Sequence, residues 1–188
     1  MIHLLMESLP KRKYIRLQKF DYSSKGAYFI TICTANRNPI LSKVIKRPHE
    51  EPQRDLRLSV GEGLAPPEYF TELTLCGDVV KKQLQSIEER FDGVIVDDFI
   101  IMPDHIHLII FLLNNTGGAS PSPTISDIIC AFKSLTTRIC KKNYNVEKLF
   151  QRSFADHIIR DKEDYETRKK YIHENPLRWY YKYLNVKN

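Results

Sequence analysis

Three runs of apolar residues predict the strands of one sheet. β-Branched and aromatic residues fill residues 27–34 and 94–102, and a third apolar run follows at 108–113. Runs of this kind, bounded by turn residues such as Gly93 and Pro103, are typical of buried strands. Because only a short turn at Pro103 separates the second run from the third, these two predict an antiparallel hairpin.

Helical spacing of apolar residues predicts the elements between and after these strands. Residues 78–91 carry apolar side chains every three or four positions, and an amphipathic helix follows whose apolar stripe consists of Ile125, Ile128, Ile129, Phe132, Leu135 and Ile139. Residues 73–76 and 149–159 fit short strands. A last helix is expected to begin at Asp161 and to end at Pro176, since proline has no backbone N–H for a helical hydrogen bond.

The order strand, helix, strand, strand, helix, strand, helix needs few crossovers. It predicts an α+β fold in which helices pack on one face of an antiparallel sheet. With 188 residues, 42% of them hydrophobic, the chain fits a single domain over 1–188. Residues 43–70 contain four of the ten prolines and many charges. This composition predicts a surface insertion that contributes nothing to the core.

The chain is basic, since 29 Lys and Arg against 23 Asp and Glu give a net charge of +6 and a pI of about 9.1. This excess favours a polyanionic partner, with nucleic acid as the leading candidate. Two basic segments can contact the phosphates of a nucleic-acid backbone. They are an arm at about residues 10–22 and the polar face of the helix after residue 125. Their DNA-binding candidates are Lys11, Arg12, Lys13, Arg16, Lys133 and Arg138. A solvated surface explains the same charges, so both interpretations stay open.

Two classes of protein are disfavoured by the sequence. The four cysteines lie far apart and form no CxxC pair, so a zinc ribbon or a disulfide framework is not expected. No stretch reaches the ~18 apolar residues of a membrane span. A cytoplasmic protein without a membrane segment is therefore expected.

A pair of histidines at the start of the third apolar run is the first candidate for chemistry. His105 and His107 are two apart, so on a strand they project from the same face, where two imidazoles can hold one metal ion. Neutral imidazoles suit Mn²⁺ or Zn²⁺, whereas Mg²⁺ prefers oxygen, so an oxygen ligand is needed besides. Alternating polar residues on strands are common, and the pair alone does not establish a site. Asp104 either hydrogen-bonds an imidazole or shapes the turn, and the turn is the preferred interpretation.

Tyr171 and Asn175 lie four apart on the last predicted helix, so they share one face at about 5–6 Å between Cβ atoms. The carboxamide oxygen of Asn175 can bind a metal beside the phenol. Alternatively, Tyr171 packs like other tyrosines and Asn175 caps the helix. Glu174 is another candidate ligand. His157 is either a helper base or, as we prefer, a structural group between apolar residues.

Five segments of the chain resemble a known family and cover nearly its whole length in order. They are residues 15–34, 102–107 (Met-Pro-Asp-His-Ile-His), 132–134, 150–160 and 171–176 (Tyr-Ile-His-Glu-Asn-Pro). Together they resemble transposases of the HUH superfamily that have a single catalytic tyrosine, most closely the group associated with repetitive extragenic palindromes. Two features depart from the family pattern. Asp104 stands where an asparagine is common, and the insertion at 43–70 matches no family segment.

The resemblance implies a ferredoxin-like domain, a divalent metal (Mg²⁺ or Mn²⁺) and single-stranded or hairpin DNA as substrate. It assigns His105, His107 and Asn175 to the metal and makes Tyr171 the nucleophile that forms a 5′-phosphotyrosine intermediate. The predicted function is therefore cleavage and rejoining of DNA in transposition or in the processing of palindromic repeats. The alternative is a protein of the same descent that binds DNA or RNA hairpins without cutting. Monomer and homodimer both stay open.

Overall fold

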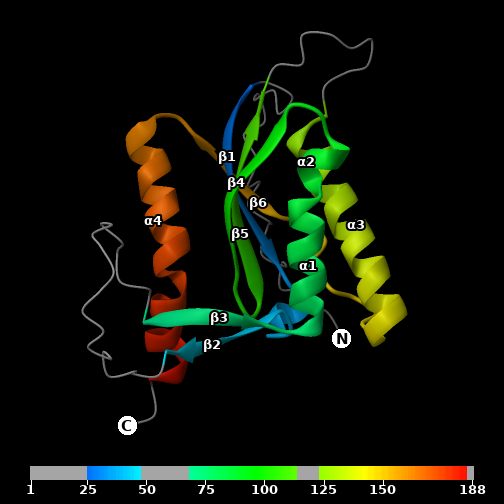
Figure 1. Ribbon diagram of the computed structural model, residues 1–188, viewed down its shortest axis with the longest axis vertical. Helices are drawn as coiled ribbons and strands as arrows, with labels where there is room; N and C mark the ends of the chain where they lie inside the picture. Colours follow the sequence, from blue (N-terminus) through cyan, green and yellow to red (C-terminus); the bar gives the residue numbers. More distant parts are fainter. Residues whose placement is uncertain (1–24, 48–67, 114–122, 186–188) are drawn as a thin grey trace, which may run out of the picture.

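The computed structural model describes residues 25–47, 68–113 and 123–185 (Figure 1). The strands are β1 (Gly26–Cys33), β2 (Ser42–Lys46), β3 (Tyr69–Leu73), β4 (Val94–Ile101), β5 (His105–Leu112) and β6 (Ala155–Ile159). The helices are α1 (Leu75–Gln85), α2 (Ile87–Arg90), α3 (Ile125–Tyr144) and α4 (Lys162–Trp179). A 3-10 turn, η1 (Ala35–Arg37), follows β1, and a π-helical segment, η2 (Tyr180–Leu184), follows α4.

The main sheet has four strands in the order β4-β5-β1-β6, and all neighbouring pairs are antiparallel. With α1 and α3 placed between the strands along the chain, this is the βαββαβ order of a ferredoxin-like fold. The predicted α+β class is thus confirmed. The hairpin of β4 and β5 is also as predicted, and Gly93 before β4 has φ 71°, a conformation that suits glycine.

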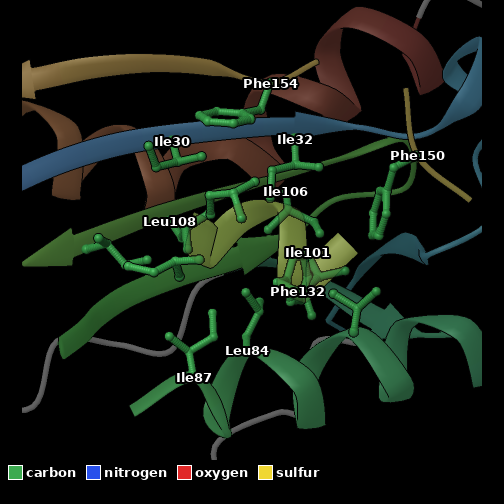
Figure 2. Close-up of a cluster of buried hydrophobic side chains, with 14 of the residues drawn as sticks. Ile30, Ile32, Leu84, Ile87, Ile101, Ile106, Leu108, Phe132, Phe150 and Phe154 are labelled. Atoms are coloured by element: carbon green, nitrogen blue, oxygen red, sulfur yellow. The ribbon is translucent and has the colours of Figure 1, made fainter. Parts of the chain in front are cut away.

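One face of the main sheet is an apolar core covered by α1 and α3 (Figure 2). Alternate residues of β1 and β5 point into it, among them Ile30, Ile32, Ile106 and Leu108, which are fully buried. They pack against the aliphatic and aromatic stripes of the two helices, whose fully buried members are Val80, Leu84, Ile125, Ile128, Ile129 and Phe132. Period-2 strands and period-3.6 helices therefore meet as the sequence predicts.

The opposite face of the sheet is covered by α4, so the expectation that helices pack on one face is right for α1 and α3 and wrong for α4. Figure 1 shows the sheet between α4 on one side and α1 and α3 on the other. On this second face Phe29, Ile109, Ile159 and Ile172 form a separate buried cluster. The reason lies in β5, where apolar residues follow one another without alternation, because a strand that is apolar on both faces needs cover on both.

A two-stranded sheet of β2 and β3 flanks the predicted insertion. Val44 and Tyr69 on these strands are buried in a small cluster with Met102, so the expectation that residues 43–70 hold no core is wrong at both ends. Residues 48–67 lie outside the described part of the chain. The predicted strand at 73–76 is also misplaced: β3 ends at Leu73, and α1 begins directly after Thr74, whose side chain accepts a hydrogen bond from the amide of Gly77 at 3.1 Å.

Helix α4 begins as predicted, with the Asp161 carboxylate accepting a hydrogen bond from the Asp164 amide at 2.8 Å. Its predicted end is wrong, because the helix passes through Pro176 and continues into η2. A proline removes one helical hydrogen bond, and tertiary packing offsets that loss here. Pro176 is buried, and just beyond it the ring of Tyr180 lies 4.4 Å from that of Tyr69.

Two aspartates at a β-bulge in β4 contact α4. The register with β5 shifts between Val96 and Asp98, which leaves Asp97 as the extra residue. Consecutive residues of a regular strand point to opposite faces, yet here both carboxylates reach α4. Asp97 accepts a hydrogen bond from the Tyr165 hydroxyl at 2.8 Å, and Asp98 lies 3.0 Å from Nε2 of His173.

Two negative expectations concern the cysteines and the membrane. All four cysteines are free thiols, in agreement with the sequence prediction. Within the described ranges, no helix combines the length and apolar composition that crossing a membrane would require.

Candidate active site

A cleft of about 360 Å³ opens between the α4 face of the sheet and the C-terminal part of α4. Strand alternation aims His105 and His107 into it, while Ile106 between them enters the apolar core. The cleft is lined by Thr31, Arg37, Asp104, His105, His107, Tyr171, Asn175, Arg178, Trp179, Lys182 and Tyr183.

The two histidine rings lie close together and are held in fixed orientations. Their centroids are 4.6 Å apart, with an angle of 73° between the ring planes. Nδ1 of His107 lies 2.9 Å from the hydroxyl oxygen of Thr31, its partner across the β1–β5 ladder. Nδ1 of His105 hydrogen-bonds the carboxylate of Asp104. These bonds leave Nε2 of each ring as the nitrogen suited to bind a metal.

Asp104 combines the two roles that the sequence left as alternatives. Its backbone carbonyl accepts hydrogen bonds from the amide and the hydroxyl of Thr34, at 2.9 and 3.0 Å, so it shapes the turn. Its carboxylate orients His105 and lies 3.4 Å from the guanidinium of Arg37. The preferred interpretation as a turn residue alone is therefore incomplete.

Burial keeps both imidazoles neutral. It lowers the pKa of His107 to about 3, and the nearby His105 and Arg37 act in the same direction. Burial also lowers the pKa of His105, although the hydrogen bond and the charge of Asp104 oppose the shift. Only neutral imidazole binds a metal ion, so the two rings are in the state that coordination requires.

Tyr171 and Asn175 both line the cleft, as their spacing predicts. The Tyr171 ring meets His107 edge-on, with centroids 5.1 Å apart and an interplanar angle of 70°. The guanidinium carbon of Arg178 lies 5.5 Å from the centre of the same ring. Asn175 is 5% exposed, and its side chain lies beside His105, where it opposes the lowering of the His105 pKa by burial. Since α4 continues beyond it, Asn175 is not a helix cap.

The donor set fits a divalent ion. Among the described residues, no three side chains of His, Cys, Asp or Glu gather to hold a metal. The cleft instead offers two neutral imidazoles and the amide oxygen of Asn175, a mixture that suits Mn²⁺ and, with phosphate and water oxygens added, Mg²⁺. Glu174 does not line the cleft and is paired with Arg178 at 2.9 Å and Lys170 at 3.7 Å.

His157 is not placed to act as a helper base. Its Nε2 lies 2.7 Å from the Asp164 carboxylate and 3.2 Å from the guanidinium of Arg168, and it is not among the residues that line the cleft. These contacts tie β6 to the first turns of α4. The preferred structural interpretation therefore agrees with the structure, and a role beside the metal does not.

The two predicted DNA-binding residues that the structure describes, Lys133 and Arg138, do not line the cleft. Lys133 donates hydrogen bonds to the backbone carbonyls of Gln151 and Arg152, at 2.7 and 2.9 Å, so its ammonium group has a structural task. Arg138 is exposed on α3, across the sheet from the cleft, and its contact with DNA stays a prediction. The candidates on the arm, Lys11, Arg12, Lys13 and Arg16, lie outside the described residues.

Sequence reasoning missed several residues of the cleft. Thr31 and Arg37 come from β1 and η1, and Arg178, Trp179, Lys182 and Tyr183 come from the chain beyond Pro176. A signal for part of this set exists: on a continuous helix, positions 171, 175, 178 and 182 fall within about 60° of one another. The sequence predicts that the helix ends at Pro176, so positions 178 and 182 were not expected to share a face with Tyr171 and Asn175.

Comparisons with known proteins show the family to which the chain belongs. Residues 69–175 match the family described as IS200-like transposases. An uncharacterised protein of Haemophilus influenzae is 30% identical over 183 residues, which cover 89% of each chain.

Two solved structures are similar to this chain, and the first of them shares its fold. A REP-associated tyrosine transposase bound to a REP hairpin superimposes with a TM-score of 0.55 at 17% identity, covering 87% of this chain and 74% of its own. A putative transposase of Deinococcus radiodurans is similar at a TM-score of 0.44 and 18% identity, covering 86% of this chain and 96% of its own. The family match spans the paired histidines, Tyr171 and Asn175. This chain belongs to the family of IS200-like transposases.

Proposed function

We propose that this protein cleaves and rejoins single-stranded DNA beside hairpins, through a covalent bond between Tyr171 and a 5′-phosphate. The observation that carries the proposal is the position of the Tyr171 ring, 5.1 Å from His107 in the cleft that also holds His105 and Asn175. A phenol beside paired imidazoles and an amide oxygen is suited to attack on a phosphodiester.

The chemistry follows from groups already in place. The phenolic oxygen of Tyr171 attacks the phosphorus, a new P–O bond forms to the tyrosine, and the bond from phosphorus to the 3′-oxygen breaks. The phenol loses its proton and the departing 3′-oxygen gains one. Because the tyrosine keeps a phosphodiester, another 3′-hydroxyl can attack it and restore the DNA without ATP.

The neighbouring groups support attack on an anion. His105, His107 and Asn175 would hold a divalent ion, Mg²⁺ or Mn²⁺, which when bound neutralises the charge on the phosphate oxygens. Arg178 and Lys182 also line the cleft and add positive charge near Tyr171. Asp104 and Thr31 keep the imidazoles oriented through Nδ1.

Hairpin DNA is the proposed substrate for two reasons. A structural neighbour with the same fold is bound to a REP hairpin, and the net charge of +6 suits a polyanion. The basic arm at residues 10–22 is proposed to add phosphate contacts to those of the cleft.

The test is trapping of the covalent intermediate. Labelled hairpins with single-stranded flanks are incubated with the protein and Mn²⁺ or Mg²⁺, and a denaturing gel is examined for a strand that migrates with protein. We expect an adduct that disappears with chelator and in Tyr171→Phe, which removes only the attacking oxygen.

Tyr165→Phe is the matched control. Tyr165 lies on the same helix but bonds Asp97 outside the cleft, so this variant should still form the adduct. Peptide mapping that places the nucleotide on another residue would contradict the mechanism. The alternative is a binding protein that does not cut DNA. It would be favoured if chelator leaves the affinity for the hairpin unchanged and no adduct forms under any condition.

A further inference from the structure

We infer that Trp179 and Tyr183 form a stacking platform for an unpaired nucleobase of the DNA strand that enters the cleft, with Lys182 beside it for a phosphate. This inference rests on the proposed function and adds a binding subsite to it. Together, Trp179 and Tyr183 form the aromatic platform.

The two rings line the cleft together with the paired histidines. The centroids of Trp179 and Tyr183 are 4.4 Å apart, and Trp179 lies 5.9 Å from His105. Continuation of the helix past Pro176 as η2 produces this stack, since residues 179 and 183 fall on the same side of it. A ladder of rings thus leads outward from the proposed metal ligands.

The outer ring of the ladder is uncovered. Tyr183 is 52% exposed although it is a large aromatic side chain, and it lines the cleft. Unpaired bases stack on exposed aromatic rings of this kind in proteins that bind single strands, whatever the base. The position next to the nucleophile is where a single strand must pass if Tyr171 is to attack its backbone.

Charge at the platform suits a nucleotide rather than an apolar ligand. Nζ of Lys182 lies 4.9 Å from the centre of the Tyr183 ring, and within the described residues it pairs with no carboxylate. A cation beside an exposed ring provides both parts of a nucleotide site, one for the phosphate and one for the base.

Tyr180, next to the platform, has a structural role that Tyr183 does not share. Tyr180 packs its ring 4.4 Å from Tyr69, against the small core of β2 and β3, and so fastens the end of α4 to the body of the protein. Trp179 contacts that core with part of its side chain but also lines the cleft. Tyr183 belongs to no buried cluster among the described residues.

Trp179 is the one tryptophan of the chain, so its fluorescence reports directly on the platform. The protein is titrated, with chelator present to keep the DNA intact, with a hairpin that carries a single-stranded flank and with the same hairpin lacking it. We expect the flanked hairpin to quench the emission and the blunt one to leave it unchanged. Equal effects of the two hairpins would overturn the inference.

Variants then test the outer ring. Tyr183→Ala should weaken binding of the flanked hairpin about tenfold, the effect of losing one stacked base, and should not alter binding of the blunt hairpin. Tyr181→Ala is the matched control, because Tyr181 is 57% exposed and does not line the cleft. Equal losses in both variants would contradict a platform at Tyr183.

Abasic sites placed one by one along the flank locate the stacked base. An abasic site at one position should abolish the quenching. Loss of that base should cause no further loss of affinity in Tyr183→Ala, because the ring on which it stacks is already absent. The inference is distinguishable from the proposed function. Adduct formation without quenching removes the platform and leaves the mechanism, whereas quenching without an adduct leaves the platform and removes the mechanism.

Discussion

On the face of the main sheet that α1 and α3 cover, β5 contributes Ile106 and Leu108, which are fully buried among other apolar side chains. On the face that α4 covers, the intervening residues of the same strand are His105 and His107, which line an open cleft. Both pairs lie on the same strand, and they differ only in that odd and even positions point to opposite faces of the sheet. A single residue step therefore separates the rigid core from the cleft, so the core side holds the histidines in place without facing the cleft.

Replacing a histidine on the cleft face should reduce DNA cleavage more than any change on the core face. His105→Ala or His107→Ala should reduce metal-dependent cleavage by about 10³-fold or more, because a bound metal supplies several kcal/mol to such a reaction. Affinity for the hairpin should remain largely intact, since the proposed phosphate contacts come from other groups. Gel assays of cleavage and titrations of binding check this, and full cleavage by either variant would remove the metal site from the proposal.

The opposite face is tested by Leu108→Ala. Leu108 is fully buried, so its truncation should lower the free energy of unfolding by about 2–5 kcal/mol. The protein that remains folded at low temperature should still cleave DNA. Urea unfolding measures the first quantity and adduct formation at low temperature the second. An unchanged stability, or a folded protein with no cleavage, would break the division between the faces.

A smaller effect is expected from the hydroxyl behind His107. Thr31→Val preserves shape but removes the oxygen 2.9 Å from Nδ1, and should weaken metal binding or cleavage by about 10- to 100-fold. The control is Thr136→Val on α3, whose hydroxyl bonds the Phe132 carbonyl at 2.6 Å on the core side. This control should alter stability alone. Equal losses of cleavage in both variants would show that packing, and not ring orientation, is responsible.

The smallest effects concern phosphate contacts. Replacing Lys11, Arg12 and Lys13 by alanine should flatten the dependence of log K on log salt, by about 0.7 for each contact with single-stranded DNA. Cleavage at saturating substrate should persist. Arg138→Gln should flatten the slope by one contact, again about 0.7. A wild-type slope for Arg138→Gln would exclude α3 from the DNA interface, and one for the arm variant would show that the arm is only solvated.

Sequence alone predicted the parts of the site that depend on local geometry. Strand alternation placed His105 and His107 on one face, and helical spacing placed Tyr171 and Asn175 on another. What joins the two pairs is long-range packing. The apolar run of β5 is buried on both faces, and periodicity does not tell which helix covers which face.

The errors near Pro176 and at residues 43–70 have a common physical origin. In each case a local signal was overruled by packing. Proline disfavours a helix, but the contact of Tyr180 with Tyr69 supports continuation. Charged residues surround Val44, yet its side chain is buried beside Tyr69. The platform residues beyond Pro176 were missed for the same reason.

The β-bulge of β4 has a consequence for the orientation of Tyr171, the proposed nucleophile. Asp97 and Asp98 hold one flank of α4, and His157 on β6 holds the other through Asp164. With both flanks fastened, α4 is prevented from rotating about its own axis. A shift by one helical position would turn each side chain by about 100° and carry Tyr171 away from the histidines. An extra residue in an edge strand thus helps to set the angle at which the Tyr171 ring lies in the cleft.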